Sequence, residues 1–119
     1  MKPGKLSDDE RLRHMLDAAN EALSFARGRS RADLDDNRML ALALVRLLEV
    51  IGEAGARVSP ERQARLPHIP WREVTGMRNR LIHGYAEVDL DIVWAVIEED
   101  LPKLVADLAP ELDAPADQS

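Results

Sequence analysis

The chain has 119 residues, which is enough for one hydrophobic core and too few to suggest two domains. Its 45% hydrophobic and 32% charged residues are ordinary for a soluble globular protein, and the low aromatic content of 3% favours a helical bundle built from Leu and Ala. The chain has no cysteine, which excludes disulfides and cysteine-ligated zinc sites. Its three histidines lack metal-ligand spacing, so we expect neither a metal nor another cofactor.

The net charge is −6, but the charges are unevenly distributed along the chain. Residues 57–86 contain six Arg and two Glu, whereas residues 87–119 contain one Lys and ten acidic residues. The total argues against broad non-specific binding of nucleic acid, while the local excess of arginine can still attract a phosphate. The N-terminus lacks the apolar stretch of a signal peptide, and no apolar run approaches the ~18 residues of a membrane span. We therefore expect a cytoplasmic protein without membrane contact.

The first two predicted helices follow from apolar periodicity. Ser7 and Glu10 form a capping box that predicts a helix over about residues 7–27, ended by Gly28. Residues 39–50 are apolar at ten of twelve positions, so the second helix cannot hide its surface against one neighbour. This helix must be central or lie at a subunit interface.

The second helix is expected to continue past Gly52 and Gly55. Each interior glycine costs ~1 kcal/mol relative to Ala, which indicates either close packing of the backbone or fraying of the helix end. Pro70 then suits a first helical position and predicts a third helix over about residues 71–82, with Gly84 as its terminator.

The last helix is predicted to begin near Asp89, where either Asp89 or Asp91 can cap its N-terminus. Pro102 lies inside its apolar stripe and predicts a kink, because proline cannot donate a helical hydrogen bond. No segment has the pattern of a strand. We expect a single all-α domain over residues 1–119, with a core of about 7–108 and a flexible acidic tail over 109–119.

The segment Met77–Tyr85, which reads MRNRLIHGY, carries the chemistry of the chain. Arg78 supplies a permanently charged fork of donors that fits a phosphate, and His83 can give and take protons near neutrality. The two lie five residues apart, or ~140° around a helix, so a straight helix would not place both on one face. A break at Gly84 or a two-fold dimer is needed to assemble them.

A structural role for these residues is the alternative. A cationic His83 at a helix C-terminus gains ~0.3–1 kcal/mol from the dipole, and Arg78 can pair with an acid such as Glu53. A degenerate bundle would then keep the motif for packing alone. Asn79 and Arg80 favour the functional interpretation, because they add an amide and a second charge within one helical turn. We count Asn79, Arg80 and Glu53 as supporting residues.

The motif resembles the hallmark of the HepT family of HEPN-domain proteins: Arg, four residues, His, one residue and Tyr, here Arg78, His83 and Tyr85. The resemblance covers about residues 8–108 and includes three further matching segments: 51–54, 69–73 and 88–94. It implies an all-α, up-and-down bundle of four to five helices. It also implies a homodimer in which both motifs face a shared cleft at the interface.

Members of the HepT family resemble the toxins of bacterial toxin–antitoxin pairs and are assigned as metal-independent ribonucleases. The resemblance therefore implies an RNA substrate and an MNT-type nucleotidyltransferase antitoxin as partner. It further implies that Tyr85 accepts AMP from that partner. The added phosphate would repel RNA and occupy Arg78.

The residues themselves suggest how RNA can be cleaved. His83 would act as general base or acid while a ribose 2′-OH attacks the adjacent phosphate, and Arg78 would stabilise the developing charge. One histidine per chain is few for both roles, so a second copy can supply the other. The alternative is a non-catalytic dimeric module that binds the nucleotidyltransferase or RNA, with the acidic last helix as a docking surface.

Overall fold

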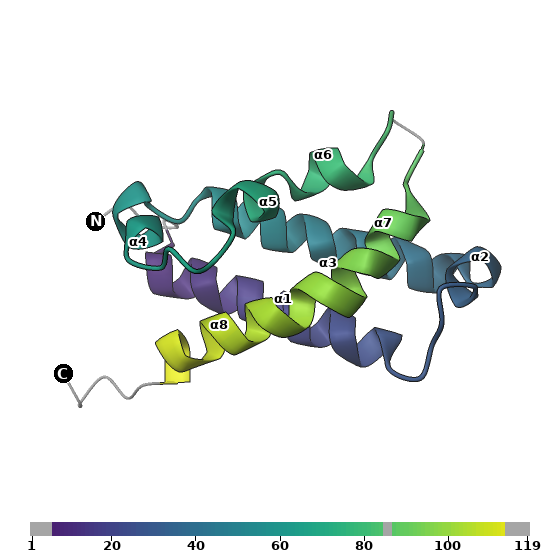
Figure 1. Cartoon of the computed structure of the whole chain (residues 1–119), viewed down its shortest axis with the longest axis horizontal. Helices are drawn as coiled ribbons and strands as arrows, with labels where there is room; N and C mark the ends of the chain where they lie inside the picture. Colours follow the sequence, from purple (N-terminus) through teal and green to yellow (C-terminus); the bar gives the residue numbers. More distant parts are fainter. Residues whose placement is uncertain (1–5, 85–86, 114–119) are drawn as a thin grey trace.

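The computed structural model describes residues 6–84 and 87–113, and Figure 1 shows their arrangement. The helical elements within these ranges are α1 (Asp8–Ala26), α2 (Asp33–Asp36), α3 (Arg38–Ala56), α4 (Pro60–Ala64), α5 (Trp71–Thr75), α6 (Met77–Leu81), α7 (Leu90–Ala95), the π-helical turn η1 (Val96–Asp100) and α8 (Leu101–Asp113). The predicted all-α class is confirmed for the described residues. None of their helices is long and apolar enough to cross a membrane.

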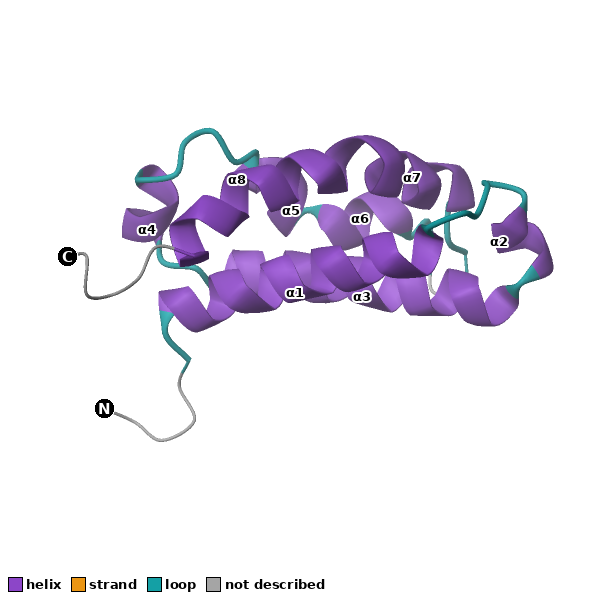
Figure 2. Cartoon of the chain, turned by 90° about the horizontal axis from the view of Figure 1, so that it is seen from below, coloured by secondary structure: helices purple, strands orange, loops and turns teal. Residues whose placement is uncertain are grey.

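The two long helices α1 and α3 pack side by side, and a rod made of α7, η1 and α8 lies across them (Figures 1 and 2). The short helices α5 and α6 lie on α3. The capping box predicted for α1 is present: the Glu10 N–H donates to Ser7 Oγ, and the Ser7 N–H donates to Glu10 Oε1. Gly28 adopts φ 75° just beyond the helix, as its predicted terminator should.

The core lies where the apolar faces of the long helices meet. Its fully buried large side chains are Leu12, Met15, Leu34, Leu44, Leu48, Ile51, Ile69, Leu81, Leu101, Leu108, Val93 and Val96. Not all of the apolar surface of α3 is covered, since Met39 is 83% exposed and Leu42 50% exposed. The helix is thus central, as predicted, and still presents apolar side chains to solvent.

The third helix predicted over residues 71–82 is wrong as a single element. It is divided at Gly76, whose φ −89° and ψ 10° leave the helical region. The second piece, α6, ends at Leu81 because Ile82 is extended, with φ −115° and ψ 122°. Gly84 was the predicted terminator, but the helix ends at Leu81, three residues before it.

The disturbance expected at Pro102 takes the form of η1. The Leu101 N–H donates to the Val96 carbonyl five residues back, which is the hydrogen bond of a π turn. A proline ring clashes with the carbonyl four residues before it, here that of Glu98. The wider turn accommodates this carbonyl without ending the rod.

The last helical segment begins at the predicted cap but ends later than predicted. Asp89 caps α7, since its carboxylate accepts the Ile92 N–H at 3.1 Å, as predicted. The helix α8 runs to Asp113, beyond the expected core boundary at residue 108, so residues 109–113 are helical. Residues 114–119 of the expected tail lie outside the described residues.

Close backbone packing explains the glycines of α3. A Cβ atom on Gly52 would lie 3.0 Å from both the Met77 Cβ and the Val74 carbonyl oxygen. A Cβ atom on Gly55 would lie 2.8 Å from Val74 Cγ1. Both glycines are buried in a continuous helix, so the packing interpretation holds and the fraying interpretation fails. The missing side chains let α5 and α6 approach the backbone of α3.

We predict that Gly52→Ala destabilises the protein. Alanine gains ~1 kcal/mol in an open helix interior, but overpacking against a backbone carbonyl costs ~1–3 kcal/mol. Urea unfolding should therefore show a net loss of stability. A matched control is Asn20→Ala on the exposed side of α1, which should be neutral or slightly stabilising. A gain of ~1 kcal/mol in Gly52→Ala would show that the close approach does not exist.

Candidate active site

The helix α6 carries the first half of the motif. It buries Met77 and Leu81 in the core, and this leaves Arg78 and Asn79 exposed on the opposite side. Arg78 lines a cavity of about 240 Å³ whose other lining residues belong to α3 and α5: Glu49, Gly52, Glu53, Ala56 and Thr75. The same glycine that admits α6 to the bundle therefore forms part of the surface beside Arg78.

The ion pair between Arg78 and Glu53, which the structural alternative invoked, does not form. Glu53 Oε1 instead lies 3.4 Å from Nη1 of Arg46, two turns earlier on the same face of α3. The Arg78 guanidinium makes no hydrogen bond or ion pair with any residue in the described ranges. Arg78 and Glu53 nonetheless line one cavity, so the acid borders the arginine without neutralising it by direct contact.

The other supporting residues differ in their surroundings. Arg80 is half-buried and donates to Asp100 Oδ2 at 3.1 Å, which ties α6 to η1. In the structure Arg80 therefore joins two elements. The Asn79 side chain is exposed, and within residues 6–84 and 87–113 it makes no hydrogen bond.

The second half of the motif lies between α6 and α7, in a short hairpin-like segment formed by residues 82–84 and 87–89. Ile82 and Val88 form an antiparallel bridge. On either side of it the His83 N–H donates to the Glu87 carbonyl at 2.9 Å, and the Asp89 N–H donates to the Leu81 carbonyl at 2.8 Å. Figure 1 shows this segment extending from the bundle between α6 and α7. Gly84 adopts φ 147° within it, a conformation that favours glycine.

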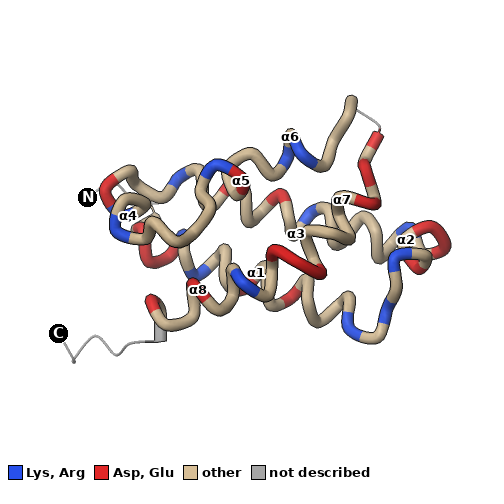
Figure 3. Tube along the Cα trace, viewed as in Figure 1, with Lys and Arg blue, Asp and Glu red and all other residues tan. Residues whose placement is uncertain are grey.

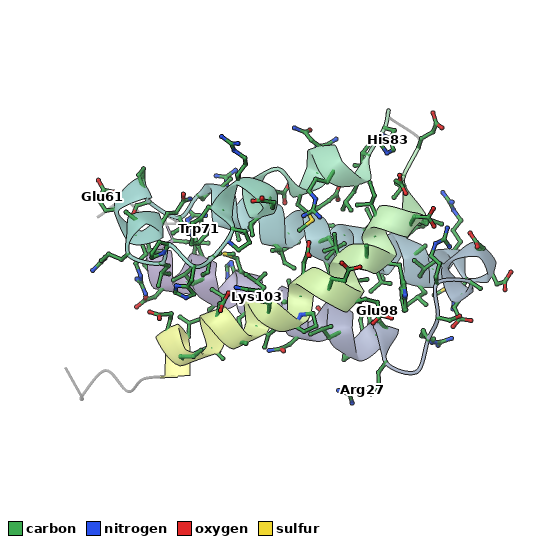
Figure 4. The ribbon with its side chains drawn as sticks, in the orientation of Figure 1. Arg27, Glu61, Trp71, His83, Glu98 and Lys103 are labelled. Carbon is green, nitrogen blue, oxygen red and sulfur yellow. The ribbon has the colours of Figure 1, made fainter. Side chains whose placement is uncertain are left out.

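His83 contacts an acidic residue that the sequence analysis treated only as a helix cap. Its Nε2 atom lies 3.2 Å from Asp89 Oδ2, and its side chain is 56% exposed. Figure 4 labels His83 where the chain leaves α6. Asp89 is half-buried. The Ile92 N–H bound to its carboxylate holds the pKa of Asp89 below its usual value, and the hydrogen bond with His83 acts in the same direction. The carboxylate is thus favoured in its charged form beside the imidazole.

Among the described residues, the cavity that Arg78 lines does not include His83. Arg78 lines the cavity against α3, whereas His83 is absent from that lining and lies in the segment leading to α7. Figure 3 shows the corresponding charges, with basic residues on α6 and acidic residues along the chain that enters α7. Tyr85, the third member of the motif, lies outside the described residues. In the part of the chain that the structure describes, no cluster of three His, Cys, Asp or Glu side chains could hold a metal ion.

The chain matches known proteins over most of its length. The family model described as Ribonuclease HepT-like matches residues 15–109. A Thermococcus cleftensis protein named "Probable ribonuclease HepT" is 34% identical over 100 residues, which is 84% of this chain and 91% of that protein. No solved structure matches.

Two further relatives carry names that give RNase as a provisional function. One, from Methanocaldococcus jannaschii, is 34% identical over 76% of this chain and 83% of its own length. The other, from Caldanaerobacter subterraneus, is 36% identical over 78% of this chain and 83% of its own length.

Proposed function

Because the chain belongs to the family of HepT-like ribonucleases, we propose that it is a ribonuclease toxin that cleaves cytoplasmic RNA with Arg78 and His83. The observation that supports this assignment most directly is the state of Arg78. Its guanidinium is exposed at the edge of a cavity and has no ion-pair partner among the described residues, although acidic residues border it. An exposed guanidinium without an ion-pair partner can donate its hydrogen bonds to a phosphate.

The proposed reaction needs no metal. His83 removes the proton of a ribose 2′-OH while the 2′ oxygen attacks the adjacent phosphorus. The bond from phosphorus to the 5′ oxygen of the next nucleotide then breaks, and a general acid returns a proton to that oxygen. Arg78 stabilises the negative charge that develops on the phosphoryl oxygens, and Asn79 orients the arginine or the ribose.

A homodimer would supply what one chain lacks. The reaction uses both a base and an acid, the chain has one histidine in the motif, and His83 does not line the cavity beside Arg78. We propose that a two-fold dimer places two copies of the motif in one cleft, where the partner's histidine takes the second role. Met39 and Leu42 support the dimer, because α3 exposes these apolar side chains to solvent.

We predict that His83→Ala lowers RNA cleavage by ~10²-fold or more, since general acid–base catalysis contributes ~10²–10⁴. Cleavage of a fluorescent RNA by the wild type should persist in EDTA. Arg78→Ala should be equally impaired while its free energy of unfolding stays within ~0.5 kcal/mol of the wild type, because the side chain is exposed.

Two results would count against this proposal. Wild-type rates in His83→Ala would exclude the mechanism. A large loss of stability in Arg78→Ala would instead indicate a degenerate bundle that keeps the motif for packing. A matched control for the stability measurement is Leu81→Ala on the buried side of the same helix, which should lose ~2–5 kcal/mol.

We further propose that an MNT-type nucleotidyltransferase acts as the antitoxin and transfers AMP to Tyr85. The basis is the position of the tyrosine, two residues after His83 in the motif. AMP on this side chain would place a negative phosphate close to the reacting groups. That phosphate would compete with RNA for Arg78, so the modified toxin would be inactive.

The modification can be detected by intact mass. Co-expression with the nucleotidyltransferase should add AMP to the wild-type chain, and Tyr85→Phe should stay unmodified because it lacks the acceptor hydroxyl. RNA cleavage by the modified protein should fall, whereas Tyr85→Phe should remain active after the same co-expression. An AMP adduct on Tyr85→Phe would place the acceptor elsewhere.

A non-catalytic module is the second candidate. The rod across the bundle exposes the acidic residues Glu98, Glu99 and Asp100, which suit a basic protein partner. A dimer that binds the nucleotidyltransferase or RNA without cleaving would use the same cleft. RNA that shifts in a gel and stays intact on incubation would favour this function over the ribonuclease.

A further inference from the structure

We propose that Asp89 is a positioning residue for His83: it holds the Nε2 nitrogen of the imidazole, so that Nδ1 is the nitrogen that exchanges protons with RNA. This inference rests on the proposed ribonuclease function. The observation behind it is the 3.2 Å contact between His83 Nε2 and Asp89 Oδ2.

The backbone around this contact is held from both sides. The His83 N–H bonds the Glu87 carbonyl, and the Asp89 N–H bonds the Leu81 carbonyl. These hydrogen bonds flank the bridge between Ile82 and Val88. They join the residues that carry the two side chains, so the backbone pairing brings the imidazole and the carboxylate together.

The carboxylate of Asp89 is itself fixed, because each oxygen has a different partner. Oδ1 accepts the Ile92 N–H at 3.1 Å and caps α7, and Oδ2 faces His83. Rotation of the side chain toward another conformation would uncap the helix. A cap is worth ~0.5–2 kcal/mol, so the same interaction that starts α7 also orients the carboxylate toward His83.

The charge state of Asp89 determines which imidazole nitrogen carries the proton. The pKa of Asp89 is lowered chiefly by the Ile92 N–H, and an ionised carboxylate only accepts hydrogen bonds. His83 Nε2 must therefore be the donor. A neutral imidazole has one N–H, which leaves Nδ1 with the lone pair that can take a proton from a ribose hydroxyl.

Asp89→Asn is the informative substitution. Asparagine caps helices as well as aspartate does, so its Oδ1 can keep the Ile92 N–H and preserve α7. Its amide nitrogen then replaces Oδ2 and donates to Nε2, which forces the neutral imidazole into the Nδ1–H tautomer. Nδ1, the nitrogen that we propose takes a proton from RNA, would then already be protonated.

We expect the substitution to change both the tautomer of His83 and the rate of RNA cleavage. Long-range proton–nitrogen NMR of the full chain, recorded under mildly alkaline conditions, should show His83 as the Nε2–H tautomer in the wild type and the Nδ1–H tautomer in Asp89→Asn. The kcat for RNA cleavage should fall ~10²-fold or more with little change in KM, as happens when a catalytic histidine is held in the wrong tautomer. Asp89→Ser keeps a cap but is too short to reach the imidazole, so it should show a smaller loss and mixed tautomers.

A matched control is Asp91→Asn in the first turn of the same helix. The Asp91 carboxylate binds Arg31 Nε at 2.7 Å and makes no contact with His83, so tautomer and kcat should match the wild type. An unchanged His83 tautomer together with wild-type kcat in Asp89→Asn would overturn the proposal. The NMR result does not require activity, so a wild type that fails to cleave RNA would refute the ribonuclease assignment and leave the Asp89–His83 pairing separately testable.

Discussion

The structure depends on the close approach of α3 to α5 and α6 at Gly52. Without a Cβ atom at this position, Met77 and the Val74 carbonyl reach the backbone of α3. Met77 and Leu81 can then be buried, which turns the opposite side of α6 and its Arg78 outward. A small residue in the middle of one helix therefore determines the direction in which a charged residue on another helix points. The packing of α6 on α3 is therefore coupled to the exposure of Arg78.

The helix α6 ends at Leu81, between Arg78 and His83, the two reacting residues that we propose. The chain turns extended at Ile82, pairs with Val88 and returns to begin α7 at its Asp89 cap. Arg78 stays with the helical surface, while His83 is held with Asp89 in the hairpin-like segment. A dimer of the kind we propose would bring the two side chains into one cleft, a chemical purpose beyond covering Met39 and Leu42.

Local signals in the sequence predicted the elements that depend on local interactions. The capping box at Ser7 and the cap at Asp89 involve residues three apart, and both are present. The break at Gly76 and the early end of α6 were missed, because they depend on packing against α3 and on pairing with Val88 across a turn. The structural alternative offered Glu53 as a partner for Arg78, but Glu53 pairs with Arg46 on its own helix. The contact between Asp89 and His83 could not be read from the sequence, since helical spacing alone does not bring residues six apart together.

Subunit mixing tests most directly whether catalysis uses both copies of His83 in a dimer, as we propose. Wild-type chains would be unfolded and refolded with increasing excess of His83→Ala chains, and RNA cleavage would be measured per wild-type chain, with the variant added after refolding as the control. We expect the activity per wild-type chain to fall toward that of the variant as mixed dimers replace wild-type dimers. Activity per wild-type chain that stays constant at every ratio would contradict the claim, because each chain would then act alone.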